Sequence, residues 1–251
     1  MPRKTLEGRT AIVTGGASGI GRAACIMLAE AGAHVAVVDL NEAGARETAQ
    51  AVEATGRRAL ALKVDVSDQE AVRAAVAQTT RTLGVPLITV SNAGVAGETV
   101  PFHKETHDHL WRHLAIHVGG TFNCFRETIE PMREAGWGRL VATSSCAAEI
   151  GLPGGSSYAA AKAALQGLVR TIALENTARG VTANCVLPGV IDTPILAAYT
   201  AERREKLLAN NPARRFGQPE DIAAAIAYLC SEDAGYTTGQ SLSPNGGLWF
   251  S

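Results

Sequence analysis

The sequence predicts an α/β protein in which helices cover both faces of a doubly wound, mostly parallel sheet. Short apolar runs rich in Val and Ile alternate with longer amphipathic stretches along the whole chain. This alternation is typical of parallel sheets, whose strands are buried on both faces. No repeat, low-complexity tract or linker divides the sequence, so we expect residues 1–251 to form a single domain.

The β-branched runs indicate about seven strands. Several runs are continuously apolar instead of alternating, as expected when helices cover both faces of a strand. The predicted strands are Thr10–Thr14, His34–Asp39, Ala59–Val64, Leu87–Ser91, Gly138–Ser144, Thr182–Leu187 and Ser241–Ser243.

Two of the helical stretches carry recognisable end signals. Ser67 and Glu70 have the spacing of a capping box, and an apolar stripe runs from Val72 to Leu83. A second helix is predicted from Ser157 to Arg179, where Gly180 can end it.

The stretch from Ile191 to Gln218 interrupts the alternation of strands and helices. Two prolines, an Arg pair and a charged helical segment separate the sixth predicted strand from the last. Such a segment is too long for a simple crossover loop. We therefore predict a lid, inserted before the last strand at about residues 191–218.

Composition argues against several classes of partner and location. The net charge of −1, without basic clusters, disfavours nucleic acid and anionic membranes as partners. The five scattered cysteines, without a CxxC pair, indicate free thiols in a reducing compartment. No apolar stretch approaches the roughly 18 residues that span a bilayer, and the first residues lack a signal segment. We expect a soluble, cytoplasmic protein.

A glycine-rich turn follows the first predicted strand. Gly15, Gly19 and Gly21 are spaced GxxxGxG directly before a helix-forming run. Backbone N–H groups at a helix N-terminus bind anions, and glycine lets a pyrophosphate approach closely. The turn therefore predicts a dinucleotide site, with a purely structural turn as the alternative.

Asp39 ends the second predicted strand, roughly 20 residues after the glycines. A carboxylate at this position can bind the ribose hydroxyls and repels a 2′-phosphate. No basic residue lies in the turn or directly after Asp39, and Arg22 is expected to brace the fold. The pattern predicts NAD over NADP as the cofactor. The alternative is that Asp39 caps a helix.

Tyr158 and Lys162 share a helix face at i, i+4 spacing. An isolated pair of this kind is more often ordinary helix surface. Ser145, however, follows the fifth predicted strand, at the edge where open α/β sheets place their sites. A neighbouring ammonium group lowers the pKa of a tyrosine from about 10. Tyr158 could then exchange a proton with an alcohol oxygen.

In this combination the motifs resemble those of the short-chain dehydrogenase/reductase family, over essentially the whole chain. The resemblance implies a Rossmann-like sheet and an NAD-dependent enzyme that interconverts a secondary alcohol and a ketone by hydride transfer. It also implies the family's usual homotetramer. The motifs are Thr14–Gly21, Asp65-Val66, Asn92-Ala93-Gly94, Ser145, Tyr158 with Lys162, Pro188–Thr193, and Pro244–Gly247, which is expected near the subunit interfaces.

The resemblance also assigns a role to each motif. Ser145 positions the substrate oxygen, Tyr158 transfers the proton, and Lys162 tunes Tyr158 and binds the nicotinamide ribose. Asp65 and Val66 contact the adenine, and the run from Pro188 covers the nicotinamide amide. The expected cofactor-binding residues are Gly15, Ser18, Gly19, Ile20, Gly21, Asp39, Asp65, Val66, Asn92, Ala93, Gly94, Tyr158, Lys162, Pro188, Gly189, Ile191 and Thr193.

The sequence departs from the family pattern at His117, which stands where an Asn usually anchors a water-mediated proton relay. An imidazole could preserve the helix kink that supports the relay. It could also carry a proton itself, because its pKa lies near neutrality, or be a steric substitute without a proton role. Ser91 and Pro86 replace a frequent Asn and a frequent Asp without removing a reacting group.

His109, His113 and His117 recur at i, i+4 and i+8. No Cys or HExxH signature accompanies them, so we predict no metal site. We expect instead that these histidines lie on a helix face in contact with solvent or a partner subunit.

Substrate specificity is expected from residues after Gly94, after Ser145 and in the lid. Their apolar character favours a small hydrophobic alcohol or ketone, although some could simply pack the lid. Arg214 and Arg215 could bind the phosphate of a hydroxyacyl or oxoacyl thioester, or be solvated surface charge. A nucleotide-binding regulator without catalysis is the third hypothesis. The expected substrate-side residues are Val95, Ala96, Val100, Cys146, Ala147, Ile150, Leu152, Ile195, Leu196 and Tyr199.

Overall fold

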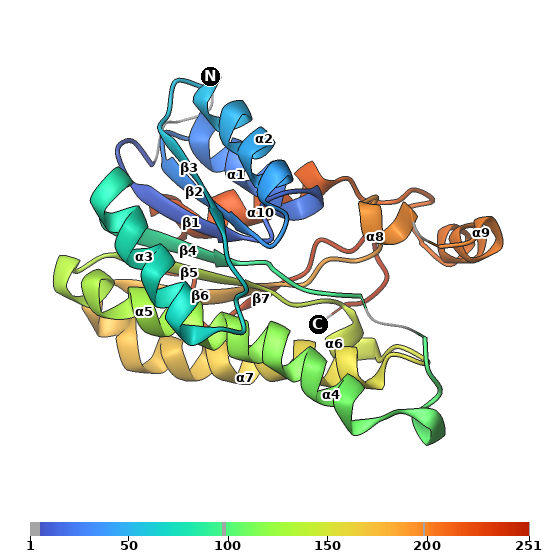
Figure 1. Ribbon diagram of the computed structural model, residues 1–251. Coiled ribbons are helices and arrows are strands. Elements are labelled where there is room, and N and C mark those ends of the chain that lie inside the picture. Colours follow the sequence, from blue (N-terminus) through green and yellow to red (C-terminus); the bar gives the residue numbers. More distant parts are fainter. Residues whose placement is uncertain (1–5, 97–98, 198, 251) are drawn as a thin grey trace.

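The computed structural model describes residues 6–96, 99–197 and 199–250. Its centre is a seven-stranded sheet with the order β3-β2-β1-β4-β5-β6-β7, and each pair of neighbouring strands is parallel. Figure 1 shows helices on both faces of this sheet. The predicted doubly wound α/β fold is confirmed.

All seven predicted strands are present, and their observed ends differ from the predicted ones by no more than one residue. They are β1 (Thr10–Thr14), β2 (His34–Asp39), β3 (Ala59–Lys63), β4 (Pro86–Ser91), β5 (Gly138–Thr143), β6 (Val181–Val186) and β7 (Ser241–Leu242).

The sheet grows in opposite directions from β1. The chain first adds β2 and β3 on one side of β1 and then returns to add β4 on the other. At such a reversal the connections leave the strand ends in opposite directions and open a crevice. The carboxyl ends of β1 and β4 therefore mark the expected position of a ligand site.

A layer of helices covers each face of the sheet (Figure 1). An apolar core lies between the sheet and each of these layers. On one face lie α1 (Gly19–Glu30), α2 (Glu42–Glu53) and α10 (Pro219–Cys230). On the other lie α3 (Gln69–Leu83), α5 (Gly120–Ala135) and α7 (Ser156–Asn176). Both faces of the central strands are therefore covered, which accounts for their continuously apolar sequences.

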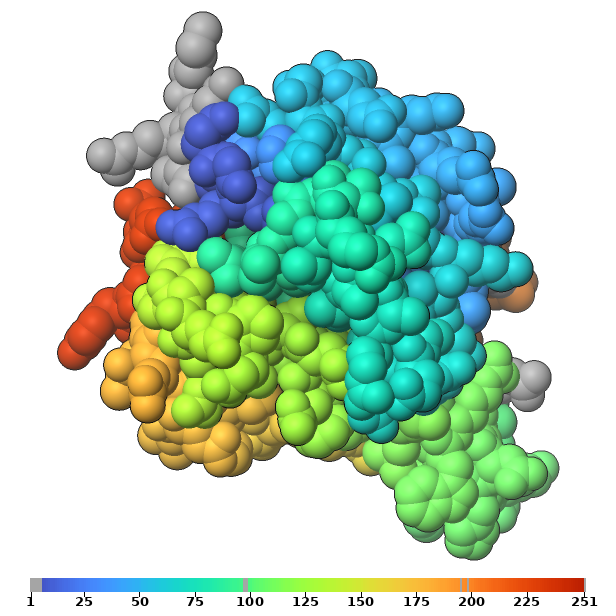
Figure 2. All heavy atoms as spheres, turned by 60° about the vertical axis from the view of Figure 1, so that its left-hand side comes forward, coloured from blue at the N-terminus to red at the C-terminus, as the bar shows by residue number. Residues whose placement is uncertain are grey.

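The remaining elements are short and lie mostly around the carboxyl edge of the sheet. Helix α4 belongs to a lobe that projects from the body of the protein (residues around 100–115, light green in Figure 2). These elements are η1 (Phe102–Lys104), α4 (His107–His113), the π-helical segment η2 (Leu114–Gly119), α6 (Ala147–Ile150), η3 (Thr177–Arg179), α8 (Pro194–Ala197), α9 (Ala201–Ala209) and η4 (Glu232–Ala234).

The segment predicted as a lid is an insertion between β6 and α10. It contains α8 and α9, and an isolated parallel bridge between Ile191 and Gly217 closes its base. In Figure 1 these two helices extend away from the sheet. Arg203 of α9 donates a hydrogen bond to Thr99 Oγ1 at 2.9 Å and lies over the Tyr199 ring. The insertion thus meets the loop that follows β4.

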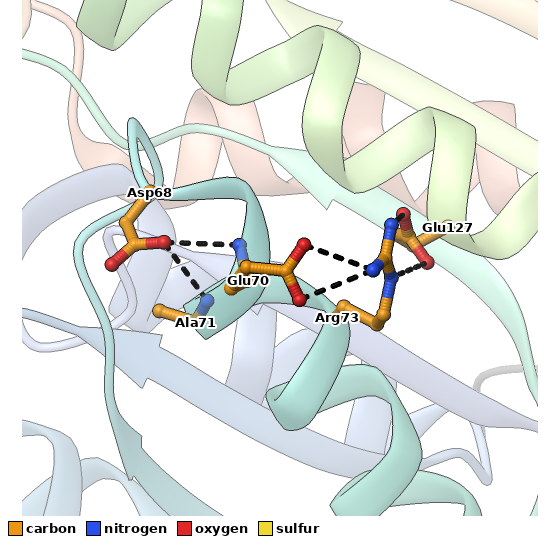
Figure 3. A network of polar contacts seen from close by, with 5 residues as sticks. All are labelled: Asp68, Glu70, Ala71, Arg73 and Glu127. Carbon is orange, nitrogen blue, oxygen red and sulfur yellow. Dashed lines mark hydrogen bonds and ion pairs between the residues drawn. The ribbon is translucent and has the colours of Figure 1, made fainter.

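The predicted capping box at α3 is wrong. Asp68, not Ser67, is the N-cap, and its carboxylate accepts hydrogen bonds from the amides of Glu70 and Ala71. Figure 3 shows this cap beside Arg73, which binds both Glu70 and Glu127 of α5. Ser67 instead donates to Asp65. The spacing rule missed the cap because Asp at the next position is an equally good N-cap.

Helix α7 ends before its predicted end at Arg179. The α-helix ends at Asn176 and a 3-10 turn continues to Arg179. Gly180 follows with φ 74°, in the left-handed region that glycine adopts without strain. Gly180 therefore ends the helical segment as predicted, but the last turn before it is a 3-10 turn and not part of the α-helix.

The five cysteines are buried and free in the described structure. None of the helices within the described ranges is long and apolar enough to cross a membrane.

Leu165 and Leu174 provide a matched test of the packing of α7. Leu165 is 1 % exposed and Leu174 is 85 % exposed. We expect Leu165→Ala to lower the free energy of unfolding by about 2–5 kcal/mol, because it leaves a cavity. Leu174→Ala should change it by no more than about 0.5 kcal/mol. Denaturant unfolding of the two variants measures the difference, and equal losses would contradict this packing.

Candidate active site

The glycine-rich turn forms a cradle at the start of α1. Gly15 and Gly19 have φ values of 65° and 51°, which favour glycine. A Cβ on Gly21 would lie 2.0 Å from the Gly15 carbonyl oxygen, so a side chain there would displace the turn. Ser18, the N-cap, makes no side-chain capping bond to any described residue. The first amides of α1 are therefore available to an anion, and the turn fits a pyrophosphate.

Asp39 lies at the end of β2, next to this turn. One carboxylate oxygen accepts the Ala17 amide at 3.0 Å and the other accepts the Asn41 amide at 2.9 Å. Asn41, not Asp39, is the N-cap of α2, because its side chain accepts the Gly44 amide. The helix-cap interpretation of Asp39 is therefore wrong. Arg22 lies 3.9 Å from Glu47 of α2, in agreement with its expected bracing role.

Thr14 and Asn92 join the ends of β1 and β4. The Thr14 hydroxyl accepts the amides of Asn92 and Ala93, both at 3.0 Å. The Asn92 side-chain amide donates to the carbonyls of Thr14 and Gly15. The floor beneath the turn is thus built from both strands. The role of Thr14 was missed in the sequence, although a threonine directly before the first glycine was the available signal.

Two other predicted cofactor segments reach the edge of the crevice. Thr193 follows β6 and lies across Gly19, since a Cβ on Gly19 would be 3.1 Å from the Thr193 methyl group. Val66 follows β3, and its side chain is 6 % exposed and packs in the core. Its carbonyl accepts the Asn123 side-chain amide at 2.9 Å. Asp65 is exposed beside it.

Lys162 is tied to the end of β5 by two hydrogen bonds. Its ammonium group donates to the Thr143 carbonyl at 2.7 Å, and its own carbonyl accepts the Ser144 hydroxyl at 2.8 Å. The residue is 4 % exposed. Burial lowers the pKa of Lys162 to about 8. Ser144, which the sequence did not single out, therefore fixes the helix that carries Lys162.

Tyr158 lies between Ser145 and Lys162. Burial raises the pKa of Tyr158, and a hydrogen bond with the Ser145 side chain opposes this rise. The Lys162 nitrogen lies 5.7 Å from the centre of the phenol ring. The direction is opposite to the lowering expected from Lys162, because loss of hydration outweighs the other effects on the phenolate. The structure nevertheless brings Ser145, Tyr158 and Lys162 together, as the sequence predicts.

His117 lies in the π-helical segment η2, where the family resemblance predicts a kink. Its Nε2 lies 3.1 Å from the Val95 carbonyl, so this nitrogen carries the hydrogen and donates it. Nδ1 is buried against Gly94 and has no hydrogen-bond partner among the described residues. Burial and, secondarily, the Lys162 charge lower the pKa of His117 to about 2. The imidazole is therefore neutral.

The carbonyl of His117 is also engaged. Thr121 donates its hydroxyl to this carbonyl at 2.7 Å, and Ser91 lies 2.8 Å from the same hydroxyl. Since Thr121 has given its only hydroxyl hydrogen to the carbonyl, Ser91 is the donor to Thr121. The two departures from the family pattern, at Ser91 and His117, thus belong to one hydrogen-bonded unit.

The expected solvent or subunit contact of the histidine face is wrong for two of its three members. His113 and His117 are 1 % and 2 % exposed, and their rings stack with centres 5.5 Å apart. Both pack edge-to-face with Tyr158, at 6.1 Å and 5.5 Å. Burial also lowers the pKa of His113. In the parts of the chain described above, no cluster of three metal-ligating side chains is arranged to hold an ion.

The substrate-side residues divide into buried and exposed sets. Cys146 and Leu196 are buried, whereas Ile150 and Leu152 are 53 % and 38 % exposed. The side chain of Ile195 lies outside the described residues. A pocket of about 660 Å³ lies beside the site, between α4 and the loop after β4. It is lined by Val95, Val100, Lys104, Glu105, Thr106, Asp108, His109, Arg112 and His113.

Residues 15–249 match the family described as Enoyl-(Acyl carrier protein) reductase. Acetoacetyl-CoA reductase of Rhizobium meliloti is 37 % identical over 243 residues, which cover 96 % of this chain and 99 % of that protein. The chain belongs to the short-chain dehydrogenase/reductase family. Its reaction type is therefore that of an oxidoreductase, and its relatives in the family use nicotinamide cofactors.

Other members of the short-chain dehydrogenase/reductase family match this chain over a comparable length. Cis-4-hydroxycyclohexanecarboxylate dehydrogenase of Sinomonas cyclohexanicum is 38 % identical over 240 residues, covering 95 % of this chain and 96 % of that one. The crystal structure of levodione reductase has a TM-score of 0.93 and 32 % identity, covering 96 % of this chain and 98 % of that one. These relatives are oxidoreductases with different substrates.

His117→Asn tests whether the imidazole titrates during the reaction. With a pKa of about 2, His117 is already neutral at every pH above that value, so it cannot produce a limb in a neutral or alkaline pH–rate profile. We therefore expect the variant to keep the shape of the kcat/KM profile between about pH 6 and 10. A limb that disappears in the variant would show that His117 carries a proton.

Proposed function

We propose that this short-chain dehydrogenase/reductase uses NAD to interconvert a secondary alcohol and a ketone. The observation that carries the proposal is the convergence of Ser145, Tyr158 and Lys162 at the end of β5. They lie along the same sheet edge as the glycine-rich turn. A proton-transferring group beside a dinucleotide cradle is what hydride transfer to or from an alcohol carbon requires.

The predicted cofactor residues fit a dinucleotide. The turn from Gly15 to Gly21 would hold the pyrophosphate, and Asp39 the adenosine ribose. Asp65 and Val66 would bound the adenine, Asn92, Ala93 and Gly94 would support the floor, and Pro188, Gly189, Ile191 and Thr193 would flank the nicotinamide. When bound, the nicotinamide supplies the hydride acceptor or donor.

The protein's own groups handle the proton. During alcohol oxidation Ser145 holds the substrate oxygen, and Tyr158 takes up the hydroxyl proton. Lys162, held by Thr143, keeps a positive charge near the phenol and stabilises the phenolate form. Because its ammonium group has donors beyond the one used by Thr143, Lys162 would also hold a ribose hydroxyl of the bound cofactor. In ketone reduction the same phenol returns the proton.

His117 helps to position Tyr158 and does not transfer a proton. Its neutral ring links the Val95 carbonyl to the Tyr158 ring, so it joins the floor of the cofactor site to the proton-transferring residue. A ring with a pKa of about 2 is too weak a base to carry a proton at neutral pH. Of the hypotheses for this position, the one without proton transfer is favoured.

A small apolar secondary alcohol is the proposed substrate class. Cys146, which directly follows Ser145, and Leu196 of the proposed lid are buried apolar side chains that would offer apolar contacts. Arg215, which could have bound a thioester phosphate, pairs with Asp221 at 2.7 Å, and Arg214 donates to the Ala209 carbonyl. These contacts favour the alcohol over the thioester alternative.

The organisation of the chain follows from the same proposal. Residues 1–251 would form one catalytic domain, with α8 and α9 as the lid over the substrate. The contact between Arg203 and Thr99 would hold this lid against the loop after β4. A homotetramer in the cytoplasm remains the expected assembly.

Tyr158→Phe tests the proposed chemistry. Removing the hydroxyl eliminates the proton donor and acceptor, so turnover of a secondary alcohol identified in a substrate panel should fall by about 10²- to 10⁴-fold. Binding of NADH, followed by fluorescence titration, should persist. Tyr236→Phe is the matched control, because Tyr236 is fully exposed. Unchanged turnover in Tyr158→Phe would rule out the mechanism.

The cofactor preference can be tested at Asp39. The wild-type protein should have a higher kcat/KM with NAD⁺ than with NADP⁺, because the carboxylate repels a 2′-phosphate. Asp39→Asn should reduce this preference by about tenfold, a difference of about 1.4 kcal/mol. Glu42→Gln, an exposed acid at the start of α2, is the control. Equal rates with both cofactors in the wild type would contradict the NAD proposal.

A further inference from the structure

The helix that carries Tyr158 begins without a capping side chain of its own. α7 starts at Ser156, and its N-cap Gly155 has no side chain. Tyr158 therefore lies in the first turn, where backbone N–H groups lack acceptors within the helix and helix ends fray most readily. The preceding residues 151–153 are exposed. The position of Tyr158 thus depends on contacts from outside α7.

A carboxylate from another segment lies at this helix end. Glu105, directly before α4, accepts the Ser156 hydroxyl at 3.0 Å, and its side chain is 9 % exposed. A negative charge near a helix N-terminus is stabilised by the helix dipole. Glu105 therefore ties the α4 lobe to the first residue of α7 through a side-chain hydrogen bond.

His109 fixes this carboxylate in place. It lies one turn further along, and its Nδ1 contacts a carboxylate oxygen of Glu105. Burial alone raises the pKa of Glu105, but the hydrogen bonds from His109 and Ser156 outweigh burial, so the pKa is lowered overall. The carboxylate is consequently ionised at neutral pH.

The same helix face continues directly to the Tyr158 ring. The rings of His109 and His113 are 4.9 Å apart, and His113 stacks on His117. The inner two rings then pack against Tyr158. The segment from Glu105 to His117 thus contacts α7 at two places. Glu105 binds the first turn of α7, and the imidazoles of His113 and His117 pack against the phenol ring of Tyr158.

We propose that Glu105 is a positioning residue for Tyr158. By anchoring the first turn of α7 to the projecting lobe (Figure 2), it holds the phenol where proton transfer to the substrate can occur. Glu105 touches neither the reacting atoms nor the glycine-rich turn, so its effect falls on turnover and not on cofactor binding. This inference rests on the proposed role of Tyr158.

Glu105→Ala and Glu53→Ala form a matched pair for the test. Glu53 is an exposed acid at the end of α2, which covers the opposite face of the sheet from α7. We expect Glu105→Ala to lower kcat by about ten- to a hundredfold, since a displacement of about 1 Å can cost that much. The dissociation constant for NADH should stay unchanged. Glu105→Gln, which keeps an acceptor oxygen but no charge, should give an intermediate kcat, and Glu53→Ala a wild-type one.

Amide hydrogen exchange provides a readout that needs no substrate. Glu105→Ala should accelerate exchange in the peptide covering residues 156–165, and Glu53→Ala should not, because Glu105 binds this helix end and Glu53 lies on another helix. Glu105→Gln serves the same comparison where truncation prevents folding.

Each outcome decides one claim. Equal kcat and equal exchange in the two alanine variants would overturn the positioning role. A parallel loss of NADH binding in Glu105→Ala would also overturn it, in favour of a general structural role. Full activity of Tyr158→Phe would instead refute the proposed chemistry, and the exchange result would still decide whether Glu105 anchors α7.

Discussion

The hydrogen bonds between the ends of β1 and β4 are the constraint on which the rest of the site depends. One threonine hydroxyl, that of Thr14, accepts two amides from the neighbouring strand, and Asn92 returns two bonds to the glycine-rich turn. At this point the sheet reverses its direction of growth, so the connections leave the strand ends in opposite directions and open a crevice. These hydrogen bonds join the two strand ends into the floor of that crevice. Gly94 and Val95, and through them His117, take their positions from it.

The sequence predicts most of the scaffold because parallel strands buried on both faces have an unmistakable composition. All strands, the glycine-rich turn and the Ser145–Tyr158–Lys162 set follow from local patterns. The orientation of the histidine face does not, because a period of four residues is the same for a buried face and an exposed one. Only tertiary packing distinguishes them, since α7 covers His113 and His117. Glu105 was equally invisible, because its partner Ser156 is distant in sequence.

Burial determines the electrostatics of the site more than pairing does. Lys162, His113 and His117 all have lowered pKa values for the same first reason, which is loss of hydration. One cation therefore sits among neutral rings, and protonation of either inner imidazole would place a second charge beside it. The buried ammonium group of Lys162 at the end of β5 thus lies apart from the carboxylate of Glu105 at the lobe.

The π-helical segment η2 has a consequence for helical phase. In an α-helix a step of four residues overshoots a full turn by about 40°, so a row of side chains drifts around the axis. The wider π-helical turn undershoots instead. The step from His109 to His113 lies in α4, and the step from there to His117 enters η2, so the two drifts oppose each other. The opposed drifts consequently keep His113 and His117 on one face of the helix, where the two rings stack and both pack against Tyr158.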